Sequence, residues 1–253
     1  MQTPSDMTGK AALVTGAAGG LGRATALKLA GVGANIYAVD INAAALEETL
    51  GELRALGVRA EGRATDLGVR ENCQAVVAAA VEAFGRLDGL CNVAAVLYTD
   101  HATEMPAADW ERTLAVNLSA PFYLIQAAIP HLLEVDGAVV NVTSCAAHRA
   151  QAYSAAYCAT KAGLSHMTKA LAMEFMNRPI RFNAVAPGGM MTGIAMNMKL
   201  PADFDRQIFG RVAPLRGMVD VEEVAELTAF LVTPAAGSYH GACINIDKGI
   251  TAD

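Results

Sequence analysis

The strongest constraint on the fold is the alternation of short apolar runs with longer helical segments along the whole chain. The expected strands are 11–15, 34–40, 58–65, 89–93, 138–143, 180–186 and 243–247. The expected helices are 22–32, 43–56, 70–84, 107–117 continued through 133, 154–177 and 221–231. Strands that alternate with helices of this length form βαβ units, and right-handed crossovers wind these units in both directions. The sequence therefore predicts an α/β protein: a doubly wound parallel sheet with helices on both faces.

We expect residues 1–253 to form a single domain. The chain is 53% hydrophobic, which is enough to bury one large core. No linker rich in Pro, Gly or Ser, no low-complexity stretch and no internal repeat divides the sequence.

Charge and hydropathy exclude several partners. The net charge is −6 without a basic cluster, so neither nucleic acid nor an anionic membrane surface is an expected partner. No apolar run approaches the roughly 18 residues that span a bilayer. The segment 1–10 is polar and lacks the apolar region of a secretory signal, so we expect a cytoplasmic protein.

The cysteines and histidines do not indicate a metal centre. The five cysteines are at positions 73, 91, 145, 158 and 243, and the five histidines are at 101, 131, 148, 166 and 240. None of these spacings matches a zinc site, and the odd number of cysteines does not favour a disulfide framework. We expect reduced thiols and no bound metal.

A glycine-rich turn follows the first expected strand. Thr15-Gly-Ala-Ala-Gly-Gly-Leu-Gly22 leads directly into a helix. Glycines permit positive φ and close approach to a pyrophosphate, and the helix N-terminus supplies unpaired N–H groups. Such a turn also occurs without a ligand, but its place between the first strand and a helix favours dinucleotide binding.

Asp40 ends the second strand, 18 residues after Gly22. A carboxylate there accepts hydrogen bonds from the adenosine ribose and repels a 2′-phosphate. Ala17, Ala18, Ile41 and Asn42 provide no cation for that phosphate. The pattern predicts NAD rather than NADP, and the alternative interpretation of Asp40 is a helix N-cap or a turn residue.

Tyr157 and Lys161 are four residues apart, which places them on one helix face. A phenol has a pKa near ~10, and a nearby ammonium lowers it toward the range of a useful base. Taken alone, this pair is more typical of an exposed helix surface than of an active site.

Together these motifs resemble the short-chain dehydrogenase/reductase family, from about Lys10 to Gly249. The resemblance implies a Rossmann-type fold and an enzyme that moves a hydride between NAD and a secondary alcohol or ketone. Asn117, Ser144, Tyr157 and Lys161 match its catalytic tetrad. The implied cofactor-binding residues are Gly16, Gly19, Gly20, Leu21, Gly22, Asp40, Ile41, Asp66, Leu67, Asn92, Ala94, Tyr157, Lys161, Pro187, Gly188 and Thr192.

The resemblance also implies a role for each tetrad residue. Tyr157 is the general acid/base, and Ser144 binds the reacting oxygen. Lys161 binds the nicotinamide ribose and lowers the pKa of Tyr157, and Asn117 positions a water in a proton relay. Two departures lie outside the tetrad: Ala95 replaces a family glycine, and the usual Asp-Gly-Gly is Asp247-Lys248-Gly249.

By the same resemblance, residues 188–215 form a lid over a small-molecule substrate. Four of the chain's eleven methionines lie in residues 190–198, which suggests an apolar or alicyclic substrate. The alternative is that these methionines pack the lid onto the body or onto a neighbouring subunit. Candidate substrate-contacting residues are Val96, Ala146, Gln151, Met190, Met191 and Met196.

Two other functions are weighed against this one. An acyl-carrier ketoreductase of the NADPH type would need basic residues near the end of the second strand, which Asp40 disfavours. A catalytically silent dinucleotide sensor would typically have lost part of the tetrad, which is intact. Family analogy further predicts a homo-oligomer, most simply a tetramer.

Overall fold

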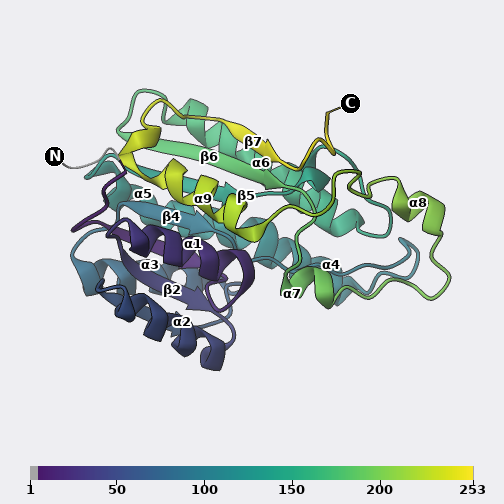
Figure 1. The fold of residues 1–253 in the computed structure, drawn as a ribbon, viewed down its shortest axis with the longest axis horizontal. Helices are drawn as coiled ribbons and strands as arrows, with labels where there is room; N and C mark the ends of the chain where they lie inside the picture. The colour runs from purple at the N-terminus through teal and green to yellow at the C-terminus, as the bar shows by residue number, and fades with distance from the viewer. Residues whose placement is uncertain (1–4, 253) are drawn as a thin grey trace.

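The computed structural model describes residues 5–252 and contains a seven-stranded parallel sheet in the order β3-β2-β1-β4-β5-β6-β7 (Figure 1). The strands are β1 (Ala11–Thr15), β2 (Asn35–Asp40), β3 (Ala60–Ala64), β4 (Gly89–Asn92), β5 (Gly137–Val142), β6 (Ile180–Pro187) and β7 (Cys243–Ile246). This sheet confirms the predicted doubly wound, Rossmann-type architecture.

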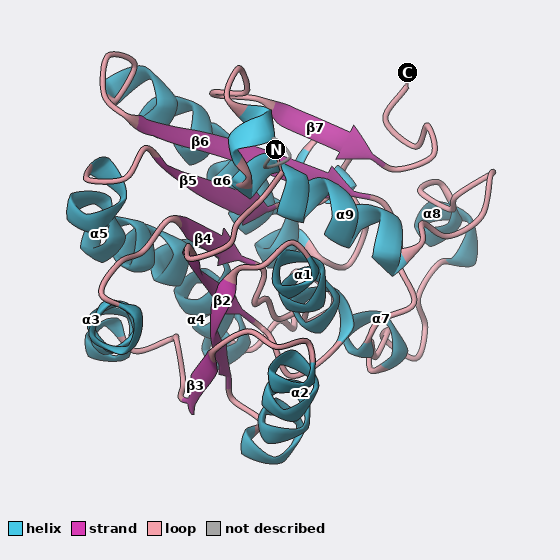
Figure 2. Ribbon diagram, turned by 60° about the vertical axis from the view of Figure 1, so that its left-hand side comes forward, coloured by secondary structure: helices cyan, strands magenta, loops and turns pink. Residues whose placement is uncertain are grey.

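Helices cover both faces of the sheet (Figure 2). They are α1 (Gly20–Gly31), α2 (Ala43–Ala55), α3 (Arg70–Phe84), α4 (Ala107–Leu114), α5 (Ala120–Leu133), α6 (Ala155–Glu174), α7 (Gly193–Met196), α8 (Arg206–Gly210) and α9 (Val221–Val232). Helices α1, α2 and α9 pack on one face, and α3, α5 and α6 pack on the other.

Alternate residues of the central strand face the two layers. Ala12 and Val14 of β1 belong to the core under α1 and α9, whereas Leu13 belongs to the core under α3 and α5. All six residues of β5 are buried. Because both faces are covered, the strands are nearly continuous apolar runs, which is why the sequence shows their positions clearly.

The chain winds outward from β1 in both directions, since β2 and β4 are its two neighbours. In an open parallel sheet, a crevice forms outside the carboxyl ends of the strands at such a switch point. The loops that follow β1 and β4 meet there, so the topology decides where the functional site lies.

Predicted boundaries differ from the observed ones mainly at the ends of elements. Helix α1 begins at Gly20, two residues earlier than expected, and β3 is shorter than the predicted 58–65. The short helices α7 and α8 were not predicted. Neither buries a residue, so neither carries the apolar periodicity from which a helix is recognised.

The helical segment Ala107–Leu133 is long and apolar enough to pass a length-and-composition test for a membrane span. It is the one such helix in residues 5–252. Leu124, Ile125 and Leu132 are buried in the core beside α3. Packing in the core therefore accounts for part of its apolar character, since 44% of the apolar window is buried.

Candidate active site

The loop after β1 forms a cradle that only glycine permits. Gly16 and Gly20 have positive φ angles of 69° and 49°. A Cβ atom on Gly22 would lie 2.0 Å from the carbonyl oxygen of Gly16, which is an impossible contact. A Cβ on Gly16 would meet the backbone of Ala94 at 3.0 Å. The glycines thus let the loop fold against the start of α1, where the helix N-terminus favours an anion.

Asp40 lies at the end of β2 beside this loop. One carboxylate oxygen accepts a hydrogen bond from the backbone N–H of Ala18 at 3.0 Å, and the other accepts one from Asn42 at 3.0 Å. These bonds fix the carboxylate at the edge of the cleft. The side chain of Asn42, not Asp40, caps α2 by accepting from Ala45, so Asp40 is not a helix N-cap. Its bond from the N–H of Asn42 does make it a turn residue, as the other part of the alternative predicts.

The cleft at the switch point measures about 520 Å³. Thirteen of the sixteen predicted cofactor-binding residues line it. These thirteen are Gly16, Gly19, Gly20, Leu21, Gly22, Asp40, Ile41, Ala94, Tyr157, Lys161, Pro187, Gly188 and Thr192. The glycine cradle, its helix N-terminus and the Asp40 carboxylate together fit a dinucleotide.

The other three predicted residues, Asp66, Leu67 and Asn92, are not among the lining residues. The carboxylate of Asp66 forms an ion pair with Arg112 at 2.7 Å and accepts from the N–H of Gly68. Leu67 is buried in the core. The amide of buried Asn92 donates to Asn141 at 2.8 Å, which joins β4 to β5. All three residues thus have structural contacts that the sequence motif does not reveal, and their contact with a cofactor stays a prediction.

Ser144 and Tyr157 lie where the cleft meets a second cavity, since both residues line both spaces. Ser144 follows β5, and its Oγ accepts a hydrogen bond from Ala146 at 3.1 Å. Tyr157 occupies the first turn of α6. Burial raises the pKa of Tyr157 to about 12, and the Ser144 hydroxyl opposes this rise by bonding to the phenol.

Lys161 lies one turn further along α6 and is 2% exposed. Its Nζ donates to the carbonyl oxygen of Val142 at 2.9 Å and lies 5.6 Å from the centre of the Tyr157 ring. Burial lowers the pKa of Lys161 to about 8. Desolvation dominates the pKa of Tyr157, and the group that opposes it is the Ser144 hydroxyl, so a lowering of this pKa by Lys161 stays a prediction.

Asn117 lies in the π-helical turn η1 (Ala115–Ser119) that joins α4 to α5. Its amide oxygen accepts from the N–H of Val96 at 2.8 Å, and its amide nitrogen donates to the carbonyl of Val96 at 2.8 Å. The same nitrogen approaches Oγ1 of Thr160 at 3.4 Å. The side chain thus ties the loop after β4 to the Tyr157 helix, a role that the sequence pattern did not predict.

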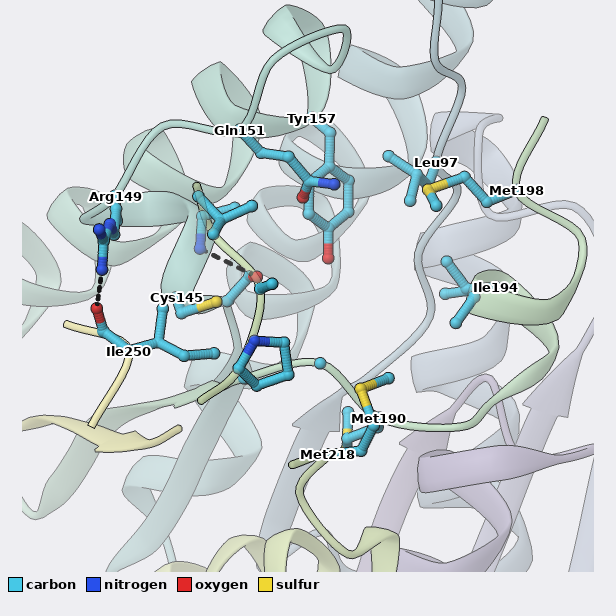
Figure 3. A pocket seen from close by; sticks show the side chains of 18 of the residues that line it. Leu97, Cys145, Arg149, Gln151, Tyr157, Met190, Ile194, Met198, Met218 and Ile250 are labelled. Carbon is cyan, nitrogen blue, oxygen red and sulfur yellow. Dashed lines mark hydrogen bonds between the residues drawn. The ribbon is translucent and has the colours of Figure 1, made fainter. Parts of the chain in front are cut away.

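The second cavity measures about 360 Å³ and is largely apolar (Figure 3). The Tyr157 hydroxyl points into it. Its walls come from the loop after β4, the 144–151 segment, residues 188–218 and the C-terminal turn. The lining side chains include Leu97, Cys145, Ala146, Gln151, Met190, Ile194, Met198, Phe209, Met218 and Ile250.

Three predicted substrate-contacting residues line this cavity: Ala146, Gln151 and Met190. Met191 and Met196 do not, since their residues are 64% and 66% exposed in the short turn around α7. Val96 does not line the cavity, and its backbone N–H and carbonyl groups bond to the side chain of Asn117. Leu97, Met198 and Met218 take these places, and only Met198 belongs to the methionine-rich run that the sequence makes visible.

The two departures from the family pattern are accommodated differently. Ala95 lines the cleft without a positive φ angle, so its methyl group imposes no backbone strain. Lys248 adopts a φ of 52°, where glycine is favoured. Its Nζ donates to the carbonyl of Met218 at 2.6 Å, so this lysine links the C-terminal turn to the cavity wall.

A group of polar and aromatic side chains joins residues 188–215 to the body. His101 pairs with Asp203 at 2.9 Å, and the Tyr153 hydroxyl accepts from the N–H of Asp205 at 2.8 Å. The Tyr153 ring lies between His101 and Phe204 in edge-to-face contacts. We call His101, Tyr153 and Asp203 the latch.

The comparisons agree with this geometry. The family model described as Enoyl-(Acyl carrier protein) reductase, of the short-chain dehydrogenase type, matches residues 16–251. A relative is 2,5-dichloro-2,5-cyclohexadiene-1,4-diol dehydrogenase LinX of Sphingobium indicum, 36% identical, with 96% of each chain covered. The chain belongs to the short-chain dehydrogenase/reductase family. It is therefore an oxidoreductase whose fold binds a nicotinamide dinucleotide.

Other members of the family are equally similar over their full lengths. D-threitol dehydrogenase of Mycolicibacterium smegmatis is 37% identical, with 97% of this chain and 94% of the relative covered. Cyclohexanol dehydrogenase of Acinetobacter sp. is 34% identical, with 96% and 95% covered. A solved short-chain dehydrogenase from Burkholderia cenocepacia, in complex with NADP, has a TM-score of 0.87 at 32% identity and covers 96% of this chain and 98% of its own.

Proposed function

We propose that this short-chain dehydrogenase/reductase is an NAD-dependent dehydrogenase of secondary alcohols, with an apolar or alicyclic substrate. The observation that carries the proposal is the shared position of Ser144 and Tyr157. Both line the dinucleotide cleft and the apolar cavity, so a substrate in the cavity meets the cofactor beside these two hydroxyls. The reduction of the corresponding ketones is the reverse of the same reaction.

The proposed roles follow from the position of each side chain. Tyr157 takes the alcohol proton during oxidation and returns it during reduction. Ser144 hydrogen-bonds the reacting oxygen and stabilises charge that develops on it. Lys161 binds ribose hydroxyls and, when protonated, favours the phenolate of Tyr157. Asn117 holds the loop after β4 against α6. The dinucleotide supplies the redox chemistry, as a hydride acceptor or donor at its nicotinamide ring.

The preference for NAD rests on Asp40. Its carboxylate is held at the cleft by two backbone N–H groups, where a 2′-phosphate would meet a fixed negative charge. Among the described residues that line the cleft, Lys161 is the only lysine or arginine, and it lies beside Tyr157 at the other end. A 2′-phosphate would thus be repelled without a compensating cation.

Cofactor preference is tested by measuring kcat/KM for NAD and NADP at saturating alcohol. We expect NAD to be favoured by about 100-fold or more, since like charges at contact cost several kcal/mol. Asp40→Ser should lower the ratio of kcat/KM for NAD to kcat/KM for NADP, mainly by raising kcat/KM for NADP. Asp66→Asn is the matched control: this aspartate pairs with Arg112 outside the cleft, so its loss should leave the ratio unchanged. Equal use of both cofactors by the natural chain would contradict the proposal.

The substrate class rests on the apolar cavity walls. Ile194, Met190 and Met198 leave few hydrogen-bonding groups for a polyol, whereas a six-membered ring fits a cavity of about 360 Å³. The names of two similar proteins, the cyclohexanol and the dichlorocyclohexadienediol dehydrogenases, point to the same class. Reduction of NAD at 340 nm should be faster with cyclohexanol than with an acyclic tetritol. A large preference for the tetritol would contradict the class.

We also propose that residues 1–253 act as one catalytic domain, that residues 188–215 are the lid and that the enzyme is a homotetramer. Trp110 and Phe122 on α4 and α5, and Met173 and Met176 at the end of α6, are large apolar side chains with exposed area to cover. Light scattering should give a mass four times that of the 26.3 kDa chain. A mass of one chain would contradict the tetramer. A cytoplasmic location stays a prediction.

A further inference from the structure

We propose that Gln151 selects substrates that carry a second hydroxyl group, so that the preferred alcohols are alicyclic diols and the ketones are hydroxyketones. This inference rests on the proposed function, because it concerns the substrate of the same site. Its central observation is a polar side chain that lines an apolar cavity and has no hydrogen-bond partner among residues 5–252.

The backbone of Gln151 is fixed against the helix that carries Tyr157. Its N–H donates to Sγ of Cys158 at 3.5 Å, and its carbonyl accepts from Oγ of Ser154 at 3.1 Å. Ser154 is fully buried and precedes α6 directly. The position of Gln151 is therefore tied to that of Tyr157, which is what a group that orients a substrate requires.

The side chain of Gln151 enters the cavity from the same side as Tyr157 (Figure 3). Within residues 5–252, no side chain or backbone group forms a hydrogen bond with its amide, whereas its backbone bonds are all made. A partly buried amide that stays unpaired in apolar surroundings is unfavourable. A substrate oxygen at this point would satisfy it.

The other charged or hydroxyl-bearing side chains of the cavity hold the C-terminal turn, belong to the reacting centre or also line the dinucleotide cleft. Arg149 donates to the carbonyl oxygen of Ile250 at 2.7 Å, so this cation holds the C-terminal turn. Ser144 and Tyr157 face the reacting oxygen. Thr192 lies against Gly20 on the dinucleotide side, where a Cβ on that glycine would touch it at 3.4 Å. Gln151 is thus the group that remains for a second substrate oxygen.

An amide both donates and accepts hydrogen bonds, as a hydroxyl does. The bond to Gln151 is consequently kept when the first hydroxyl of a diol becomes a ketone, because the second hydroxyl is unchanged. A carboxylate or phosphate would use only the donor and would face no free cation. The chemistry therefore favours a neutral hydroxyl over an anionic group.

The test compares cyclohexanol with the 1,2-, 1,3- and 1,4-cyclohexanediols for the natural enzyme and for Gln151→Met, which has nearly the same volume without the amide. We expect at least one diol to exceed cyclohexanol in kcat/KM by about tenfold or more. In Gln151→Met, that diol should lose about tenfold, chiefly through KM, and cyclohexanol should lose far less. Met198→Leu, an apolar change in the same wall, should affect both alcohols by the same factor.

Two results would overturn the inference: equal kcat/KM for cyclohexanol and every diol in the natural enzyme, or an equal loss for both alcohols in Gln151→Met. If none of the alcohols is oxidised, the proposed function is wrong instead. Quenching of NADH fluorescence by added diol then still tests whether Gln151 binds the second hydroxyl group. Binding of a diol that the methionine variant weakens about tenfold supports the inference, and unchanged binding contradicts it.

Discussion

The cofactor cleft and the substrate cavity share Ser144 and Tyr157 but are built in different ways. The cleft is formed by backbone at the ends of β1, β2 and β4, and its shape depends on glycines that no other residue can replace. Much of the cavity is formed by side chains of residues 188–218, in which α7 and α8 bury nothing. On the proposed function, the reaction chemistry thus lies in the part built from backbone and glycines, and substrate choice lies in a segment with few buried side chains.

The largest effect that tests this contrast is expected from Gly22→Ala. The new methyl group would lie 2.0 Å from the carbonyl oxygen of Gly16, so the loop and α1 must separate. We expect binding of the dinucleotide to be abolished and the free energy of unfolding to fall by about 3 kcal/mol or more. Gly31→Ala is the matched control, because Gly31 lies at the other end of α1, outside the cleft, and has nothing within 4 Å of its Cβ position. Fluorescence titration and chemical denaturation measure both effects. Similar losses for the two variants would contradict a backbone-defined cleft.

This difference also explains what could be predicted from the sequence. The proposed roles of Gly22, Asp40 and Tyr157 depend on backbone geometry and on fixed spacing along the chain. Both features can be recognised in the sequence. The cavity instead joins Leu97, Met218 and Ile250, which are far apart in the chain and carry no motif. Asp66 and Asn92 also fit the motif, but the motif does not reveal the partners that the structure gives them, an ion pair with Arg112 and a strand-bridging bond to Asn141.

The next largest effect should come from Tyr157→Phe. Removing the hydroxyl deletes the proposed general acid/base, so kcat should fall by about 1000-fold. Binding of the dinucleotide should stay within about twofold, because the glycine cradle and Asp40 are untouched. Stopped assays with cyclohexanol and a parallel titration with NADH test both parts. Retained turnover would place the proton transfer elsewhere, and Tyr153→Phe, which changes the latch tyrosine, is the control for a general loss of order.

Lys161→Met should show how much the burial of a charged ammonium group destabilises the folded chain. Burial lowers the pKa of Lys161 from 10.5 to about 8 in the folded chain. Between these values the unfolded chain binds more protons, so this lysine makes stability rise with pH, and its full cost is present below pH 8. The methionine variant should gain stability relative to the natural chain at pH 7, by at most about 3 kcal/mol, and the gain should shrink toward pH 10.5. Thermal unfolding at several pH values measures this gain, and a gain that is independent of pH would contradict the assignment.

The smallest effect is expected from the latch, on the cavity side of the comparison. The hydrogen bond to Asp203 raises the pKa of His101, with the carboxylates of Asp100 and Glu104 adding to it, and the same bond lowers the pKa of Asp203. The His101 contribution is complete below its unfolded pKa of 6.5 and is lost as pH rises through its folded pKa. The Asp203 contribution is complete above 3.8 and is lost as pH falls through its folded pKa.

Between these limits the charged pair holds residues 188–215 against the body. Asp203→Asn should therefore raise KM for the alcohol at pH 6, by only about twofold because exposed ion pairs contribute little. The difference should vanish at pH 9, where His101 has lost its charge. Glu104→Gln removes a neighbouring negative charge but keeps the hydrogen bond between His101 and Asp203, so it should change KM less than Asp203→Asn. The ratio of KM values, variant over natural, cancels the titration of Tyr157. A ratio that stays constant with pH would show that aromatic packing around Tyr153, rather than charge, holds this segment.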